Sequence, residues 1–378
     1  MGQDHNESRS GPRARPLLRD VASLARVGTG TVSRVLNNSG PVAEETRQRV
    51  LDAVTKLGYR PDPFARGLRS RSTRLIGLIL PDLLNEFYAQ ASTVIAEKLV
   101  QAGFQLLVST ANTPQQELAA LESLADMHVD GIINVPSSNE VTLPDDIPIV
   151  QLNRYSINSK APAVLCDEQH GFFELMNLVL HAGHRDIAIV IGNPHHSTTR
   201  ERLNGMRLAC APFGLVVPEQ GGVESPAGRV QVLCGEYSQQ WGESAIDEIF
   251  NADTASLTQK TNSQIEGGHT DHHHRWQPSV IVASSPRIAS GVVCALSRHN
   301  IRIPEDISVV AYDDPQWYSL WSPGMTALVA PMSEMGALAA ELLLKRIAGE
   351  EIDSRNHYLT AHIERRGSLI ERSCQHDS

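Results

Sequence analysis

A cluster of small polar residues near the N-terminus, followed by one arginine, has the chemistry needed to read DNA: Thr29, Gly30, Thr31, Ser33 and Arg34. Hydroxyl groups at the start of a helix that enters the major groove reach phosphates or base edges. An arginine one turn further along the helix can donate two hydrogen bonds to a guanine. The alternative is a small helical bundle on which the same residues form only a solvated polar face.

The flanking sequence supplies the elements that would place this cluster on a short second helix. Residues 20–25 carry apolar side chains at helical spacing and predict a first helix. Val27 and Gly28 predict a tight turn after it. Residues 43–57 predict a third helix, and Gly58 stands where such a helix would stop. Three short helices of this kind predict a helix-turn-helix domain.

The chain divides into four segments by composition. Residues 1–16 are rich in Ser, Gly, Pro and Arg and are expected to be a disordered tail. The helix-turn-helix domain occupies residues 17–60, and a basic hinge or linker follows at residues 61–74. Residues 75–378 have the apolar content of a large globular core. The length suits two or three domains.

Charge separates the N-terminal part from the rest of the chain. Residues 9–74 carry 14 Lys and Arg against 5 Asp and Glu, whereas residues 75–378 carry 19 against 36. The formal net charge of −10 therefore conceals a basic module joined to an acidic body. This asymmetry favours binding of a polyanion by the first part alone, although a solvated basic tail would carry the same charge.

The core is expected to be a two-lobed α/β structure with parallel, doubly wound sheets. Helical stretches alternate with short apolar runs that predict buried strands at residues 75–80, 105–109, 131–135, 149–152, 187–191, 279–283 and 307–311. Nearly 300 residues suit two such lobes. We expect the first lobe at about residues 75–167 and 331–350, and the second lobe at about residues 168–330 and 351–372.

Residues 251–277 do not fit this alternation, since they are polar and rich in histidine, and we expect an exposed insertion there. The histidines at 269 and 272–274 could hold Zn²⁺ or Ni²⁺, but clustered histidines in a polar loop are more often solvated, so no metal or cofactor is expected. Five scattered cysteines, no secretory signal and no membrane-spanning run predict a cytoplasmic protein.

Several motifs resemble the landmarks of one known family, the LacI/GalR-type bacterial transcriptional regulators. TVSRVLN resembles the family's headpiece, and LIGLILPDLLNEFYAQ, HVDGIINVP, HAGHRDIAIVIG, RERLNGMRLA and PEDISVVAYDD resemble successive parts of its effector-binding core. The resemblance covers residues 17 to about 370. It implies a core similar to periplasmic sugar-binding proteins, with a ligand cleft between two lobes.

For the headpiece, the resemblance implies base contacts from Thr29, Gly30 and Arg34, and contacts with phosphates or nearby backbone from Thr31, Ser33 and Asn37. It also implies that the segment after Tyr59 folds into a hinge helix on DNA, where Leu68, with Ala65 beside it, enters the minor groove as a wedge. The alternative for Leu68 is a linker residue that packs on the core. The DNA-binding set is therefore Thr29, Gly30, Thr31, Ser33, Arg34, Asn37, Tyr59, Ala65 and Leu68.

Two positions depart from the family's usual headpiece. Arg26 and Gly28 stand where Gly and Ser are common. Arg26 is therefore expected in a strained turn, and the second helix is expected to lack a hydroxyl at its N-cap.

For the cleft, the resemblance implies an apolar wall of Phe87 and Tyr88, a donor at Arg202 and an acceptor at Asp313. Asn153 and Ser285 line the same cleft in this comparison, where Asp and Asn are common in the family. Arg202 could instead pair with a glutamate on its own helix, and Asp313 could cap a strand-end turn. Arg200 together with Arg202 favours a sugar acid over a neutral sugar.

The sequence thus predicts a transcriptional regulator, expected to be a repressor, controlled by a sugar or sugar derivative. We expect a homodimer on a pseudo-palindromic double-stranded DNA operator, with pairing through the core that includes the apolar helix Met332–Ile347. The alternatives are a cytosolic sugar-binding protein and a sugar-processing α/β enzyme. No paired catalytic motif supports an enzyme.

Overall fold

The computed structural model describes residues 16–59, 72–138, 140–251, 276–353 and 355–372. The chain forms two compact units, Met1–Thr73 and Arg74–Ser378, which we call the headpiece and the core. The expected tail, most of the expected hinge with Ala65 and Leu68, and most of the expected insertion at residues 251–277 lie outside the described residues.

The headpiece contains α1 (Leu18–Ala25), α2 (Thr29–Leu36) and α3 (Glu44–Leu57). Their apolar faces meet in a small core built from Val21, Ala22, Ala25, Val32, Val35, Val50 and Ala53. The three expected helices are confirmed. Gly58 ends α3 with a φ of 61°, a left-handed conformation that glycine adopts without steric cost.

The turn between α1 and α2 has the two features expected from its sequence. Arg26 ends α1 with φ 53° and ψ 47°, a left-handed backbone conformation that is strained for a residue with a Cβ atom. Gly28 is the N-cap of α2, and no side chain accepts a hydrogen bond from the first turn. The Thr31 backbone N–H donates to the Gly28 carbonyl at 2.9 Å, so within the described residues the N–H groups of Thr29 and Gly30 are the ones open to an external acceptor such as a phosphate.

The first lobe of the core is a six-stranded parallel sheet with the strand order β12-β5-β4-β3-β1-β2. Its strands are β1 (Leu75–Leu80), β2 (Gln105–Thr110), β3 (Gly131–Asn134), β4 (Ile149–Leu152), β5 (Ala163–Cys166) and β12 (His357–Leu359). The helices of this lobe are α5 (Glu86–Gln101), α6 (Pro114–Asp126) and α13 (Met332–Ile347). Apolar runs such as LIGLIL form strands here because the sheet is covered on both faces.

The second lobe is a seven-stranded sheet with the strand order β13-β11-β10-β9-β6-β8-β7, parallel except at its two edges. Its strands are β6 (Ile187–Ile191), β7 (Gly221–Ser225), β8 (Gly228–Cys234), β9 (Val280–Ala283), β10 (Ser308–Tyr312), β11 (Thr326–Val329) and β13 (His362–Glu364). Its helices are α7 (Glu168–His181), α8 (Ser197–Cys210), the 3₁₀ turn Ala211–Phe213, α9 (Gln239–Asn251), α11 (Pro286–Arg298) and α12 (Gln316–Leu320). The expected doubly wound parallel architecture is confirmed in both lobes.

The chain crosses between the lobes three times, and the last crossing differs from the expectation. The sequence predicts residues 351–372 in the second lobe, but β12 pairs with β5 in the first sheet, and of these two strands only β13 joins the second sheet. The first lobe therefore extends to Leu359. The backbone N–H of Asp167 donates to the Leu359 carbonyl, which ties two of the crossings together.

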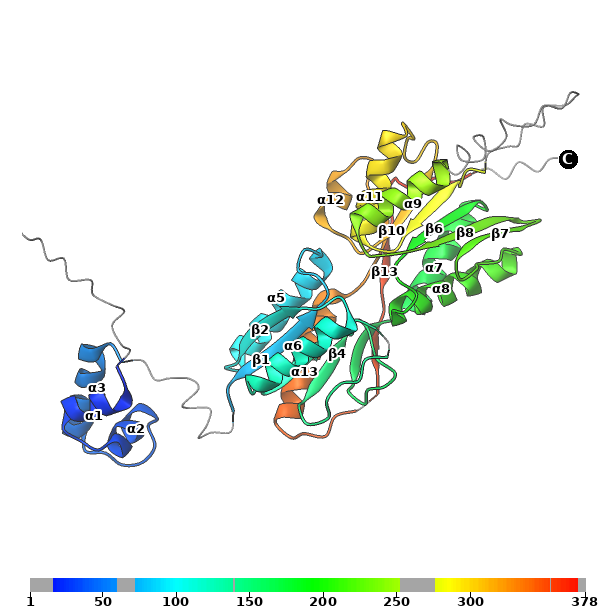
Figure 1. The fold of residues 1–378 in the computed structure, drawn as a ribbon. Coiled ribbons are helices and arrows are strands. Elements are labelled where there is room, and N and C mark those ends of the chain that lie inside the picture. The colour runs from blue at the N-terminus through cyan, green and yellow to red at the C-terminus, as the bar shows by residue number, and fades with distance from the viewer. Residues whose placement is uncertain (1–15, 60–71, 139, 252–275, 354, 373–378) are drawn as a thin grey trace, which may run out of the picture. The chain divides into compact units, whose positions relative to one another are not determined.

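The prediction that α13 takes part in pairing of two copies is wrong. Its apolar residues are buried within the chain, where α13 contacts α5, β3, β4 and β5. Figure 1 shows this helix, in orange, beside the cyan elements of the first lobe, although residues 153–331 separate it from β4 in the sequence. A face already packed against its own lobe is not available to a second copy.

No helix within the described residues has both the length and the apolar character required to cross a bilayer.

A buried histidine fixes the C-terminal segment to the second lobe. One ring nitrogen of His184 lies 2.9 Å from Ser279 Oγ, and the other lies 3.1 Å from the Ile370 carbonyl oxygen. Burial lowers the pKa of His184 from 6.5 to about 4, so the ring is neutral at neutral pH. The unfolded chain therefore binds this proton more readily than the folded protein, and the stability that depends on the neutral ring is present above pH 6.5 and decreases as the pH falls towards 4.

We expect unfolding free energy to fall by about 2 kcal/mol between pH 7 and pH 5 on account of this one histidine. Urea titrations at the two pH values measure it. His184→Gln should show a shallower dependence on pH than the wild type, while the exposed His170, changed to Gln, should leave the dependence as it is. An unchanged dependence in His184→Gln would assign the effect to other groups.

Candidate functional site

A cavity of about 650 Å³ lies between the two lobes of the core, at the carboxyl ends of their parallel strands. Ligands of open parallel sheets bind at this end of the strands. All six side chains expected in the effector cleft line this one cavity: Phe87, Tyr88, Asn153, Arg202, Ser285 and Asp313. They come from α5, the end of β4, α8, the start of α11 and the end of β10.

Aromatic rings form one wall of the cavity, as expected. Phe87 and Tyr88 lie in the first turn of α5, and their rings meet edge to face with centroids 4.9 Å apart. Tyr312 of the second lobe lies 6.4 Å from Phe87 and extends the wall across the lobes. Asn153 Nδ2 donates to the Tyr88 hydroxyl at 3.1 Å, while its Oδ1 is buried without a hydrogen-bond partner. That oxygen is available to a donor on a ligand.

Arg202 is held in place by a carboxylate, but not by one on its own helix. Its Nε and Nη2 donate to the two oxygens of Glu168 on α7, at 3.0 and 2.8 Å, and Nη1 donates to the Ser284 carbonyl. Both side chains of the pair are at least 96% buried. Burial opposes the charge of Arg202, but the adjacent Glu168 raises its pKa well above the ordinary value. Arg202 is therefore fixed in position at the cavity, and Glu168 balances its charge.

Asp313 lies at the end of β10 and lines the cavity in a left-handed backbone conformation with φ 60°. Burial raises the pKa of its carboxyl group well above the usual range, and Arg202 opposes this shift only in part. A buried carboxyl group in this state is well suited to accept or donate a hydrogen bond to a hydroxyl group of a ligand.

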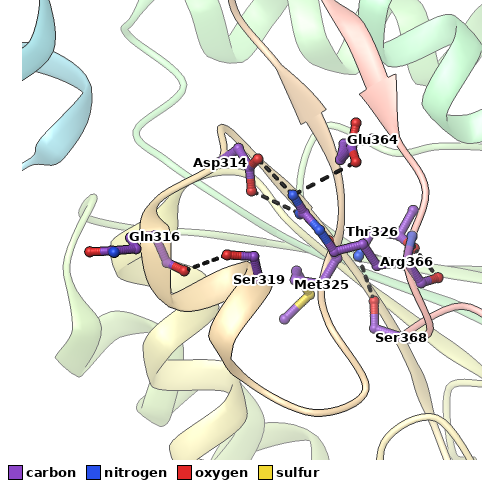
Figure 2. A network of polar contacts seen from close by, with 8 residues as sticks. All are labelled: Asp314, Gln316, Ser319, Met325, Thr326, Glu364, Arg366 and Ser368. Carbon is purple, nitrogen blue, oxygen red and sulfur yellow. Dashed lines mark hydrogen bonds and ion pairs between the residues drawn. The ribbon is translucent and has the colours of Figure 1, made fainter.

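The neighbouring Asp314 anchors this loop to the C-terminal segment. Figure 2 shows Arg366 donating to both oxygens of Asp314, at 2.8 and 2.7 Å, and to the Met325 carbonyl at 2.9 Å. The Thr326 hydroxyl donates to the Arg366 carbonyl, and the Thr326 backbone N–H donates to Ser368. The network fixes the loop that carries Asp313 to residues just beyond the third crossing.

Ser285 lines the cavity and also caps a helix. It is the N-cap of α11, where its hydroxyl oxygen accepts from the Ile288 backbone N–H at 3.2 Å. Arg200, in contrast, is exposed and does not line the cavity. The preference for a sugar acid that was drawn from Arg200 and Arg202 therefore has no support at these two residues.

Sequence reasoning missed a second polar group of the cavity, formed by Ser137, Arg154, His196 and Tyr237. The His196 ring stacks on Tyr237 with centroids 5.7 Å apart, and the Arg154 guanidinium lies 5.6 Å from the centroid of the same ring. Burial and then Arg154 lower the pKa of His196 to about 3, so it is neutral at pH 7. The one sequence feature that could have indicated this group is that Arg154 directly follows Asn153, a residue already expected in the cleft.

An ion pair joins the lobes at the cavity. Arg287 at the start of α11 donates to Asp82, which follows β1, and both side chains are about one third exposed. In the order of the sequence these residues are 205 positions apart. The pair thus contributes to holding the lobes in the arrangement seen here.

Six of the expected DNA-reading residues lie on α2 or directly after it. Thr29, Gly30 and Arg34 on α2 are exposed, as is Asn37 just after it, while Thr31 and Ser33 are half-buried. Within the described part of the headpiece, the hydrogen bonds of Arg34 are two long ones to its own helix, 3.4 Å to the Gly30 carbonyl and 3.3 Å to the Thr31 hydroxyl. Tyr59 packs against the headpiece core instead of projecting freely. Among the described residues, no cluster of His, Cys, Asp or Glu forms a metal site.

Comparisons with known proteins agree with this division of the chain. Residues 17–62 match the family model of bacterial regulatory proteins of the lacI family. Residues 73–255 match the periplasmic binding proteins and sugar-binding domain of the LacI family, and residues 177–369 match a periplasmic binding protein-like domain.

This chain matches three similar proteins over nearly the whole length of each of them. A putative LacI-family repressor from Corynebacterium glutamicum is 33% identical, with a TM-score of 0.63 over 78% of this chain and 99% of that one. Catabolite control protein A of Priestia megaterium is 28% identical over 356 residues, which is 92% of this chain and 98% of the relative. The transcriptional regulator CelR, solved with cellobiose, is 27% identical, with a TM-score of 0.63 over 94% of this chain and 100% of that one.

Proposed function

Because this chain belongs to the LacI family of bacterial regulatory proteins, we propose that it is a transcriptional repressor whose affinity for DNA is set by a small molecule in the core cavity. The observation that supports this most directly is the exposed face of α2. It combines hydroxyl groups, open backbone N–H groups and an arginine whose hydrogen bonds within the described residues are long ones to its own helix. Such a surface suits phosphate contacts at the helix start and base readout one turn later.

The protein is proposed to bind a pseudo-palindromic operator as a homodimer, with one headpiece on each half-site. Because α13 is packed within its own lobe, another surface must pair. Three exposed apolar side chains lie on β2 and on the two helices that contact it: Val100, Val108 and Leu118. Strand β2 is also an edge of the first sheet, so its outer backbone groups lack a strand partner. We favour this face as the dimer interface.

The effector is proposed to be a sugar or sugar derivative. Convergence of an aromatic wall, a buried carboxyl group at Asp313 and an unpartnered amide oxygen at Asn153 suits a compact ligand with several hydroxyl groups. The ligand would bind the two lobe arrangements unequally and so shift the equilibrium between DNA-binding and released states.

Selection of bound sequences from a random duplex library, with the purified full chain, tests the proposal. We expect an enriched pseudo-palindrome, and an affinity for it that falls steeply as salt concentration rises. Weak binding that does not discriminate between sequences would contradict the proposal and leave the cavity as the remaining functional site.

Arg34→Ala is expected to weaken binding to the selected operator by about 10- to 100-fold, because one bidentate contact with a base discriminates by about 1–3 kcal/mol. Titration of labelled operator duplexes measures this loss. Binding to unrelated duplex DNA should change much less than operator binding. Arg49→Ala, an exposed arginine on α3 outside the predicted reading face, is the matched control. Equal losses in the two variants would mean that Arg34 acts only through its charge.

A further inference from the structure

One buried cation in the core cavity has no anion to balance it. The Arg154 side chain lies at the end of β4 and lines the cavity, and the residue is only 6% exposed. Within the described part of the chain, no carboxylate lies within ion-pair distance of its guanidinium. Its one hydrogen bond to another described residue runs from Nη1 to the Pro136 carbonyl at 3.5 Å, the long limit for such a bond, and its Nε has no partner among these residues.

Burial of an arginine in this state is costly, since a guanidinium carries five donors and a permanent charge. The other two arginines that line the cavity are both compensated, Arg202 by Glu168 and Arg287 by Asp82. Arg154 is the exception among the lining arginines. Its contact with the face of the Tyr237 ring offsets only a small part of the cost.

Further unpartnered polar atoms belong to the side chains around Arg154. Ser137 Oγ and His196 Nδ1 are both buried without hydrogen-bond partners. Four of the described acidic residues line the cavity: Asp82, Glu140, Glu236 and Asp313. Glu140 and Glu236 are exposed, so solvent screens them, and Asp82 pairs with Arg287. Asp313 is buried, and burial raises the pKa of its carboxyl group, which favours the neutral form. A buried cation with unsatisfied hydrogen-bonding groups beside it has the composition of an anion-binding subsite.

We propose that the ligand of this cavity carries an oxyanion, either a carboxylate or a phosphate, and that the Arg154 guanidinium binds it. This inference rests on the proposed function, in which the cavity holds the effector. The ligand would place its oxyanion at Arg154, with Ser137 and His196 beside it, and its hydroxyl groups near Asn153 and Asp313. A sugar acid and a sugar phosphate share this chemistry.

Thermal unfolding of the full chain tests the proposal with matched pairs of probes: glucose against glucuronate, galactose against galacturonate, and glucose against glucose 6-phosphate. Inorganic phosphate serves as the minimal oxyanion. We expect millimolar phosphate to raise the unfolding temperature, and at least one charged sugar to raise it more than its neutral partner does. The carboxylate and phosphate pairs identify which oxyanion the site takes. A larger rise with the neutral partners, or no rise with any anion, would overturn the proposal.

Arg154→Gln isolates the residue, and Arg200→Gln is the matched control, since it removes the same charge from an exposed position outside the cavity. Phosphate also stabilises proteins non-specifically, and this contribution is common to both variants. We expect Arg154→Gln to bind the best charged probe about 10- to 100-fold more weakly, Arg200→Gln to bind it as the wild type does, and Arg154→Lys to retain part of the affinity.

Removal of an uncompensated buried charge should leave the ligand-free protein as stable as before, or more stable. A purely structural arginine would instead lower the unfolding temperature without ligand, and that result, together with unchanged anion binding, would contradict the proposal. Titration of the selected operator with each variant separates the two inferences. Loss of anion binding in Arg154→Gln with normal operator binding supports both, whereas a wild-type protein that binds phosphate but no operator would remove only the proposed function.

Discussion

Replacing Arg202 with methionine is expected to lower the free energy of unfolding of the core by about 3–5 kcal/mol. The substitution leaves Glu168 buried beneath the cavity with its charge and without its partner, while the Tyr312 hydroxyl remains its one other donor at 2.8 Å. Removing one partner of a buried ion pair lowers the free energy of unfolding more than removing both, because the remaining charge is neither paired nor hydrated. The double variant Glu168→Gln with Arg202→Met should therefore be more stable than Arg202→Met alone.

Chemical unfolding of the three proteins at pH 7 measures these differences. Arg298→Met is a matched control, since Arg298 is 55% exposed and pairs with Glu243 and Asp247 at the surface, where an ion pair contributes at most about 1 kcal/mol. The loss in Arg202→Met should also diminish at pH 5, because an unpaired buried carboxyl group has a raised pKa and the folded variant then takes up the proton. A loss that is the same at both pH values, or no larger than that of Arg298→Met, would contradict this account.

Gly205→Val is expected to destabilise the core by about 3 kcal/mol by separating α7 from α8. A Cβ at position 205 would overlap the Gln169 carbonyl oxygen and come within 2.9 Å of the Phe173 backbone nitrogen. Both are backbone atoms of α7, so no side-chain rotation relieves the overlap. Since Gln169 adjoins Glu168, the displacement falls where the Glu168–Arg202 pair forms, and the cavity should distort together with the fold.

Thermal unfolding and affinity for the best charged probe measure the two effects of Gly205→Val together. Asn204→Ala lies on the exposed side of the same helix and should change the free energy of unfolding by less than about 0.5 kcal/mol. A Gly205→Val protein as stable as Asn204→Ala would show that α7 and α8 can move apart at little cost.

Much of the fold could be predicted from sequence because the main strands are buried on both faces. Runs such as residues 75–80 and 187–191 are continuously apolar, which only a covered sheet allows. The edge strands β7, β12 and β13 were missed, since they are short or exposed and carry no such run. Strands β5, β8 and β11 were missed as well, and length does not explain β5, since β3 and β4 are equally short and were predicted. Helix α13 was misassigned because an apolar helix has the same sequence whether it faces its own lobe or a second copy.

The candidate site was predicted as a set of lining residues but not as a set of charges. Six expected residues do line one cavity, because the motifs that carry them end parallel strands or start helices at the same edge. Pairing cannot be read from spacing, however, since Glu168 and Arg202 are 34 positions apart and Asp82 and Arg287 are 205 apart. That Arg154 has no balancing carboxylate can be recognised only when the ion pairs of the other cavity residues are known from the structure.

The last crossing of the chain has a consequence for synthesis of the protein. The headpiece uses only contiguous residues 18–59, so it can fold soon after it leaves the ribosome. Neither sheet of the core is complete until β12 and β13 have emerged, because each lobe takes one of these two strands and both follow all the other described strands in the chain. A truncation before His357 therefore damages both lobes at once and spares the headpiece. On the proposed function, such products would meet DNA as single headpieces without a paired core, and we expect them to compete poorly with the proposed dimer for its operator.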